Sequence, residues 1–88
     1  MLVVRYTRHA RDKFKTKEAK LFKIGKKTIE YIAKTASVVE IEENVVTMVG
    51  PLDEKHSLCV VIKYEGKDIK IITFFAAKKG RYERKILH

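Results

Sequence analysis

Several residue types and patterns are missing or rare in this chain of 88 residues, and most of these absences exclude a class of protein. Tryptophan is absent, and the single cysteine, Cys59, excludes a disulfide within the chain and fits a reducing compartment. No stretch approaches the roughly 18 consecutive apolar residues of a membrane helix. The apolar run at the N-terminus is too short for a signal peptide. We therefore expect a soluble, cytoplasmic protein without a membrane partner.

The motifs of the common catalytic and cofactor sites are also missing. One cysteine and the three scattered histidines, His9, His56 and His88, give no zinc-binding spacing. There is no Gly-rich phosphate loop, no Ser-His-Asp signature and no paired acidic motif of the metal-nuclease kind. We therefore expect neither a metal nor an organic cofactor, and we expect Cys59 to be a core residue.

What the chain does have is a strong segregation of charge. Residues 1–36 hold eleven Lys or Arg against three acidic residues, a net charge of +8. Residues 37–77 hold four against seven, a net −3, and residues 78–88 hold five against one, a net +4. Basic segments that fold onto one face of a domain can gather phosphate groups. The pattern indicates a protein that faces nucleic acid, but it identifies no reaction.

Length and composition predict one globular domain that spans residues 1–88. This length suffices for a single domain, and 45% hydrophobic residues exclude a disordered tail in spite of the net charge of +9. The preference for Lys, Glu and Ile is typical of a heat-adapted intracellular protein.

The first half of the chain predicts one strand and two helices. Residues 2–6 are mostly β-branched or aromatic, and Thr7 can cap a helix that follows them. Residues 15–23 are rich in lysine and fit either a continued helix or a basic loop. A second helix over residues 26–36 has one apolar stripe. That stripe consists of Ile29, Ile32, Ala33 and Ala36.

The second half predicts antiparallel strands. The strands are expected over residues 38–42, 45–49, 58–62 and 69–76, with the tail, residues 78–88, as a returning edge strand. Glu43-Asn44 fits a tight turn because Asn tolerates left-handed backbone angles. The order predicts an α+β fold, in which an N-terminal strand and two helices pack on one face of a three- to four-stranded, mainly antiparallel sheet. An uncovered first or last strand could pair with a second copy, so a homodimer stays open.

Two short motifs lie near the two ends of the chain. Residues 7–14 read Thr-Arg-His-Ala-Arg-Asp-Lys-Phe, and residues 77–82 read Ala-Lys-Lys-Gly-Arg-Tyr. With the expected order of elements, they resemble a bacterial and archaeal family of unknown function that opens with a His-Ala helix and lies near the RelE/ParE toxin superfamily. The resemblance implies a RelE-like fold, metal-independent cleavage of mRNA, often on the ribosome, and an antitoxin partner. No fixed catalytic set of such a toxin is matched, so the fold transfers more safely than the activity.

Metal-free RNA cleavage needs a base for the 2′-hydroxyl, cations for the transition state and an acid for the leaving 5′-oxygen. As a histidine, His9 can act as base or acid. Arg81 can bind the phosphate, and Tyr82 can stack on a base or donate a proton. The residues predicted to contact nucleic acid are Arg8, Arg11, Lys13, Lys78 and Lys79. If the tail returns beside the first helix, all of these groups meet over one groove.

Each candidate also has a purely structural interpretation. The His9 ring can pack and bond to the backbone, Arg8 and Arg11 can be solvated, residues 78–81 can form an ordinary basic turn, and Tyr82 can pack on the sheet edge. Three functions therefore stay open. The first is an RNA-directed, toxin-like protein or metal-independent endoribonuclease. The second is a non-catalytic nucleic-acid-binding module, and the third is a domain that docks an acidic, antitoxin-like protein.

Overall fold

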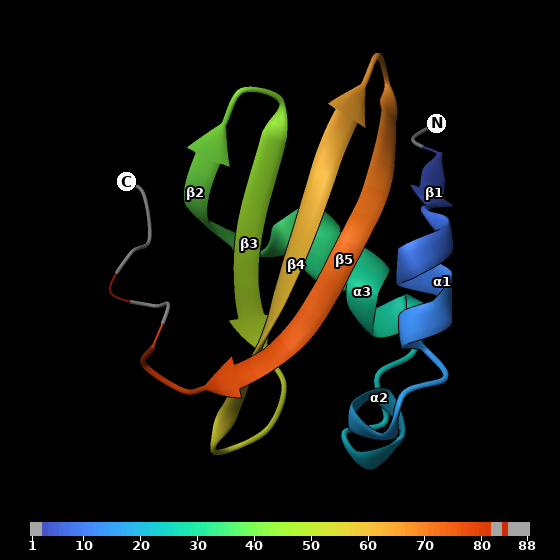
Figure 1. The fold of residues 1–88 in the computed structure, drawn as a ribbon. Coiled ribbons are helices and arrows are strands. Elements are labelled where there is room, and N and C mark those ends of the chain that lie inside the picture. Colours follow the sequence, from blue (N-terminus) through green and yellow to red (C-terminus); the bar gives the residue numbers. More distant parts are fainter. Residues whose placement is uncertain (1–2, 82–83, 85–88) are drawn as a thin grey trace.

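The structure is a computed structural model that describes residues 3–81 and residue 84, and it shows an α+β fold (Figure 1). In the described residues, three helices and one five-stranded mixed sheet follow in the order β1-α1-α2-α3-β2-β3-β4-β5. The elements are β1 (Val4–Tyr6), α1 (Arg8–Lys13), α2 (Lys17–Leu21), α3 (Lys26–Thr35), β2 (Ser37–Glu42), β3 (Val45–Pro51), β4 (His56–Glu65) and β5 (Asp68–Lys78).

The sheet has the strand order β1-β5-β4-β3-β2. Strands β2 to β5 form an antiparallel meander, whereas β1 pairs with β5 in parallel, with Val4 opposite Ile69. The two edge strands are therefore β1 and β2, and the described part of the tail adds no strand, since Gly80 lies in a turn and Arg84 in a 3₁₀ turn. The expected edge strand over residues 78–88 otherwise lies largely outside the described residues.

Two threonines begin the first two helices. Thr7 Oγ1 accepts the amide of Ala10 at 3.0 Å, and Thr16 Oγ1 accepts the amide of Ala19 at 3.2 Å, so each satisfies a free amide of a first turn. The second cap was not predicted. It explains why the lysine-rich stretch forms a separate short helix, α2, and why the described residues form three helices where two were expected.

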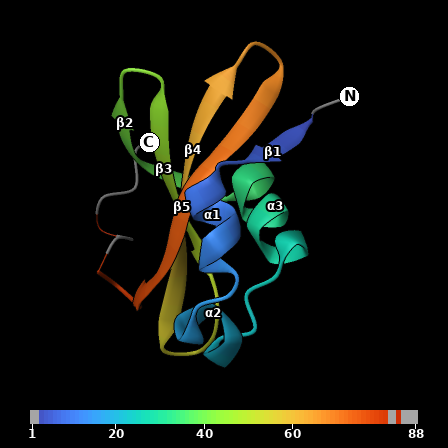
Figure 2. The same ribbon diagram turned by 45° about the vertical axis from the view of Figure 1, so that its right-hand side comes forward.

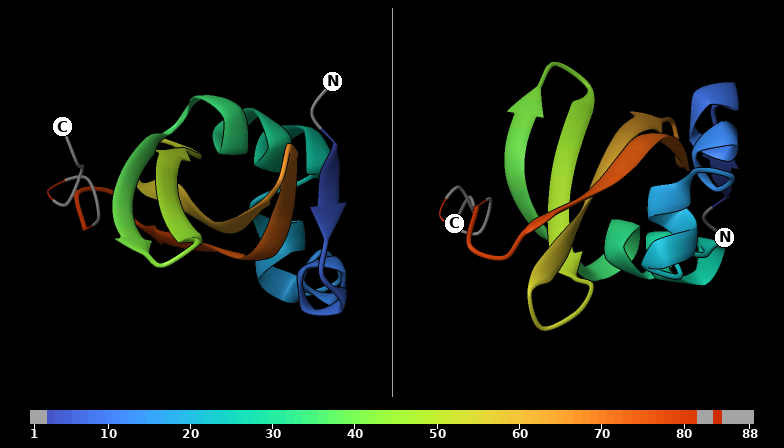
Figure 3. Two further views of the ribbon diagram at one scale, coloured as in Figure 1. Left: turned by 90° about the horizontal axis from the view of Figure 1, so that it is seen from above. Right: turned by 60° about the horizontal axis from the view of Figure 1, so that its bottom comes forward.

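The main apolar core lies between the helices and one face of the sheet, and a smaller apolar cluster of Val39, Val49, Cys59 and Ala77 is separate from it. Figures 2 and 3 show α3 on this face, and its buried residues Ile29, Ile32 and Ala33 form the stripe that the sequence predicts. The backbone of Gly50 on β3 lets Ile32 approach closely, because a Cβ there would lie 2.9 Å from Ile32 Cγ1. Ala10 and Ala19 add α1 and α2 to the same core.

Strand β4 is central and buried on both faces, as its unbroken apolar run predicts. Leu58, Cys59 and Val60 are fully buried, which confirms that Cys59 is a core residue. The turn between β2 and β3 falls at Glu43-Asn44 as expected, but the left-handed backbone belongs to Glu43, with φ of 55°, and not to Asn44. Within the described residues, no helix is long and apolar enough to span a membrane.

Candidate nucleic-acid interface

His9 lies at the start of α1, beside the middle of β5. Helix α1 follows β1 directly, and the Thr7 amide donates to the main-chain oxygen of Ile71 at 3.0 Å. The Thr7 hydroxyl donates to the oxygen of Ile72 at 2.9 Å. This anchoring places the exposed His9 ring against β5, with Nε2 3.2 Å from Thr73 Oγ1. His9 thus has a hydroxyl partner on the sheet, in place of the backbone partner that the structural interpretation expected.

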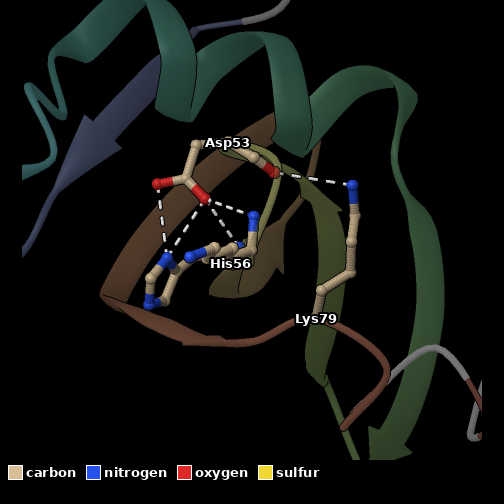
Figure 4. A network of polar contacts seen from close by, with 4 residues as sticks. Asp53, His56 and Lys79 are labelled. Carbon is tan, nitrogen blue, oxygen red and sulfur yellow. Dashed lines mark hydrogen bonds and ion pairs between the residues drawn. The ribbon is translucent and has the colours of Figure 1, made fainter.

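A second cluster lies in the loop between β3 and β4, and the sequence did not point to it. Asp53 Oδ1 accepts the amides of Lys55 at 2.8 Å and His56 at 2.7 Å, and it lies 3.1 Å from His56 Nδ1 (Figure 4). These bonds, led by that of the Lys55 amide, lower the pKa of Asp53 below its usual value. The Asp-x-x-His spacing in a polar loop was the only signal in the sequence.

The His56 ring is held on two sides. Asp53 fixes Nδ1, and the ring of Phe22 lies edge-on at 4.7 Å between centroids. The side chain is still 35% exposed, and its other nitrogen points away from Asp53 (Figure 4). An imidazole oriented by a carboxylate, with its second nitrogen accessible, is an arrangement that can move protons.

Lys79 belongs to this second cluster. Its amide donates to the oxygen of Lys55 at 2.9 Å, and its Nζ lies 3.5 Å from the main-chain oxygen of Asp53 (Figure 4). The loop also borders an open hollow of about 310 Å³, lined by Asp53, Glu54, Lys55 and His56. Among the described residues, no group of three or more His, Cys, Asp or Glu side chains could hold a metal ion.

The structure does not bring the two predicted halves of the active site together. His9 contacts Thr73, and Lys78 follows five residues later on the same extended strand, about 17 Å away at the rise of a β-strand. Figures 1, 2 and 3 agree that residues 79–81, directly after β5, lie at the opposite end of that strand from α1. Within the described residues, the single groove that the sequence suggested is therefore not formed, because β5 carries residues 78–81 away from α1.

The remaining predicted residues divide between these two places. Arg8, Arg11 and Lys13 lie on α1 with His9, and Lys13 Nζ lies 5.7 Å from the centroid of the Phe74 ring. Lys78, Lys79 and Arg81 lie at the end of β5, where the Arg81 amide donates to the oxygen of Lys78 at 3.1 Å. The prediction for Tyr82 lies outside the described residues.

The helices carry an unbalanced positive charge. Residues 8–35 hold ten Lys or Arg against three acidic residues. Two of these carboxylates turn toward the fold, since Glu18 accepts the amide of Ala76 at 3.3 Å and Glu30 accepts the hydroxyl of Tyr6 at 2.7 Å. In the part of the chain that the structure describes, none of the ten cations has an acidic partner within 4 Å. We call residues 8–35 the basic helix layer.

Negative charge gathers at the edge of the sheet opposite β1. The hairpin of β2 and β3, residues 37–51, has no Lys or Arg and carries three exposed glutamates, Glu40, Glu42 and Glu43. It forms the far edge of the sheet from β1 and α1 (Figure 1). The fold therefore keeps the charge segregation of the sequence as a separation in space.

Comparison with protein-family models, curated proteins and solved structures finds no match to this chain. The resemblance to the family near the RelE/ParE toxins, and the RelE-like fold that it implies, stay predictions.

Proposed function

We propose that this protein binds RNA through the basic helix layer. The observation that supports the proposal is the charge of residues 8–35, ten basic and three acidic, with two of the carboxylates turned into the fold. Cations that lack acidic partners attract a polyanion, and the release of its counterions drives binding. The acidic hairpin at the opposite edge of the sheet repels phosphates and so disfavours binding there.

The proposal is tested by measuring the binding of a fluorescent single-stranded RNA as a function of salt. Each phosphate contact contributes about −0.7 to the slope of log K against log salt, so binding should weaken steeply. The triple change Lys15→Glu, Lys17→Glu and Lys20→Glu on the basic helix layer should abolish binding, since all three side chains are exposed.

A matched control carries the same change of net charge elsewhere. Lys55→Glu, Lys63→Glu and Lys67→Glu also lower the net charge by six, but they lie outside the basic helix layer. Equal losses in both triple variants would show that only net charge matters. Binding that does not respond to salt, or no binding at all, would contradict the proposal and favour the acidic protein partner. If the protein binds a single DNA strand of the same sequence as tightly as the RNA, its ligand is any single-stranded nucleic acid.

Metal-independent cleavage is a second candidate function, and the Asp53–His56 pair favours it. A carboxylate that orients an imidazole supports acid–base chemistry, and Lys79 adds a cation to the same loop. Incubation of RNA with the protein and a chelator tests this candidate. Cleavage that is lost in His56→Ala but kept in His9→Ala would place the reaction at the loop, and the reverse result would place it at α1. Intact RNA, with and without ribosomes, would exclude cleavage.

A further inference from the structure

The outward face of α3 carries an exposed aromatic ring between two lysines. Tyr31 is 65% exposed, although the opposite face of the same helix is fully packed. Lys27 lies four residues before it and Lys34 three residues after it, so both share its face one turn away in each direction. Both lysines are exposed.

The fold makes no use of this ring. In the described residues, the Tyr31 hydroxyl makes no hydrogen bond, and the bond from Thr35 Oγ1 at 2.7 Å is accepted by the main-chain oxygen of Tyr31. Tyr6 shows the contrast, because its hydroxyl bonds to Glu30 and its ring lies 5.8 Å from that of Phe14. A large aromatic side chain in solvent, beside two cations that lack acidic partners, is available to a ligand.

We propose that Lys27, Tyr31 and Lys34 form a binding site for single-stranded RNA, in which the Tyr31 ring stacks on an unpaired base. This inference rests on the proposed function, RNA binding, and locates a binding site for it on α3. Aromatic rings bind bases of any sequence through their faces, and flanking cations hold the phosphates. Lys27 and Lys34 lie about 10.5 Å apart along the helix axis, so their flexible stems reach backbone on both sides of the stacked nucleotide.

The charge around the site favours an anionic ligand. Glu30, the one acidic residue of α3, is engaged by the Tyr6 hydroxyl and is half-buried, so it does not lie on the outward face. A strand with accessible bases is required, because in a duplex the bases are paired and stacked on each other. We therefore expect single-stranded RNA to bind more tightly than a duplex of the same sequence.

The test compares Tyr31→Ala and Tyr31→Phe with a matched control, Tyr64→Ala. Tyr64 lies on β4 and is 49% exposed, so the control removes a similar ring from another surface. With a labelled RNA of about ten nucleotides, Tyr31→Ala should weaken binding at least about fivefold, whereas Tyr31→Phe and Tyr64→Ala should bind like the wild type. Circular dichroism confirms that each variant is folded.

Salt titrations separate stacking from charge. Lys27→Gln and Lys34→Gln should each lower the salt slope by about 0.7, whereas Tyr31→Ala should weaken binding and leave the slope unchanged. If the wild type binds RNA but Tyr31→Ala binds equally well, the stacking site is wrong and the proposed function stands. Equal binding of duplex and single strand would also overturn the site. A wild type that binds no RNA overturns both.

Discussion

The Thr7 hydroxyl donates a hydrogen bond to the main-chain oxygen of Ile72, 65 residues further along the chain, at 2.9 Å. Thr7 Oγ1 also accepts the amide of Ala10 at 3.0 Å and so caps α1. One side chain therefore begins the first helix and ties it to β5. This link places α1 beside the middle of β5.

We expect Thr7→Ala to lower the free energy of unfolding by about 1–2 kcal/mol, because it removes a helix cap and leaves the Ile72 oxygen without its donor. Thr7→Ser keeps the hydroxyl and should stay close to the wild type. Urea denaturation followed by circular dichroism measures both. Equal stability of Thr7→Ala and the wild type would contradict this role.

Gly50→Ala should destabilise the protein by about 1–3 kcal/mol, the usual cost of overpacking a core. The new Cβ would lie 2.9 Å from Cγ1 and 3.2 Å from Cδ1 of Ile32, which is buried and has little room to move. A double-mutant cycle with Ile32→Ala checks the cause. If the clash is with Ile32, the two changes together should cost less than the sum of the single costs.

The stability of the fold should depend on Asp53 in acid. The amides of Lys55 and His56 and the His56 ring hold the pKa of Asp53 below its usual value of 3.8, so the unfolded chain takes up the proton first as the pH falls. The contribution of this carboxylate is complete above about pH 4 and is lost as the pH falls through the lowered pKa.

Asp53→Asn should therefore flatten the pH dependence of the unfolding free energy below pH 4. The amide oxygen can still accept the two loop amides, so the variant should fold. Glu54→Gln is the control, because Glu54 is exposed and has no hydrogen bond to the rest of the described chain. Acid titrations of urea unfolding compare the three proteins, and a Glu54→Gln profile as flat as that of Asp53→Asn would argue against this pair.

Measurements of RNA binding can test whether the basic residues of α1 act separately from those at the end of β5. Arg8→Gln with Arg11→Gln should lower the salt slope by about 1.4, as expected for two lost phosphate contacts. Lys78→Gln with Lys79→Gln removes the same charge at the far end of β5, and it should change the affinity by less than about twofold. Similar losses in both pairs, measured by fluorescence anisotropy, would show that the tail turn takes part in binding.

Much of the fold could be predicted from local patterns. The apolar stripe of Ile29, Ile32 and Ala33 is buried as expected, since helical periodicity places these residues on one face. The unbroken run around Cys59 lies in the central strand, since burial on both faces demands apolar side chains at every position. The α2 helix was missed because a single threonine cap, Thr16, decided between two conformations of a lysine-rich stretch.

The candidate site could be predicted less well. The sequence identified the basic residues of α1 from their charge. It could not predict which residues surround them, because that depends on which strand packs beside α1. His56 was interpreted only as a loop residue. Its bond to Asp53 depends on a turn, and its contact with Phe22 depends on the end of a helix 34 residues earlier in the chain.

By itself, the sequence determined the class of fold, the composition of the core and the segregation of charge, because each follows from the periodicity or composition of short segments. Only the tertiary structure decided which charged groups share a surface. The parallel pairing of β1 with β5 places α1 beside the middle of β5 and carries Lys78 to the other end of the strand. Distance in space is set by strand order, and strand order depends on the packing of the whole chain.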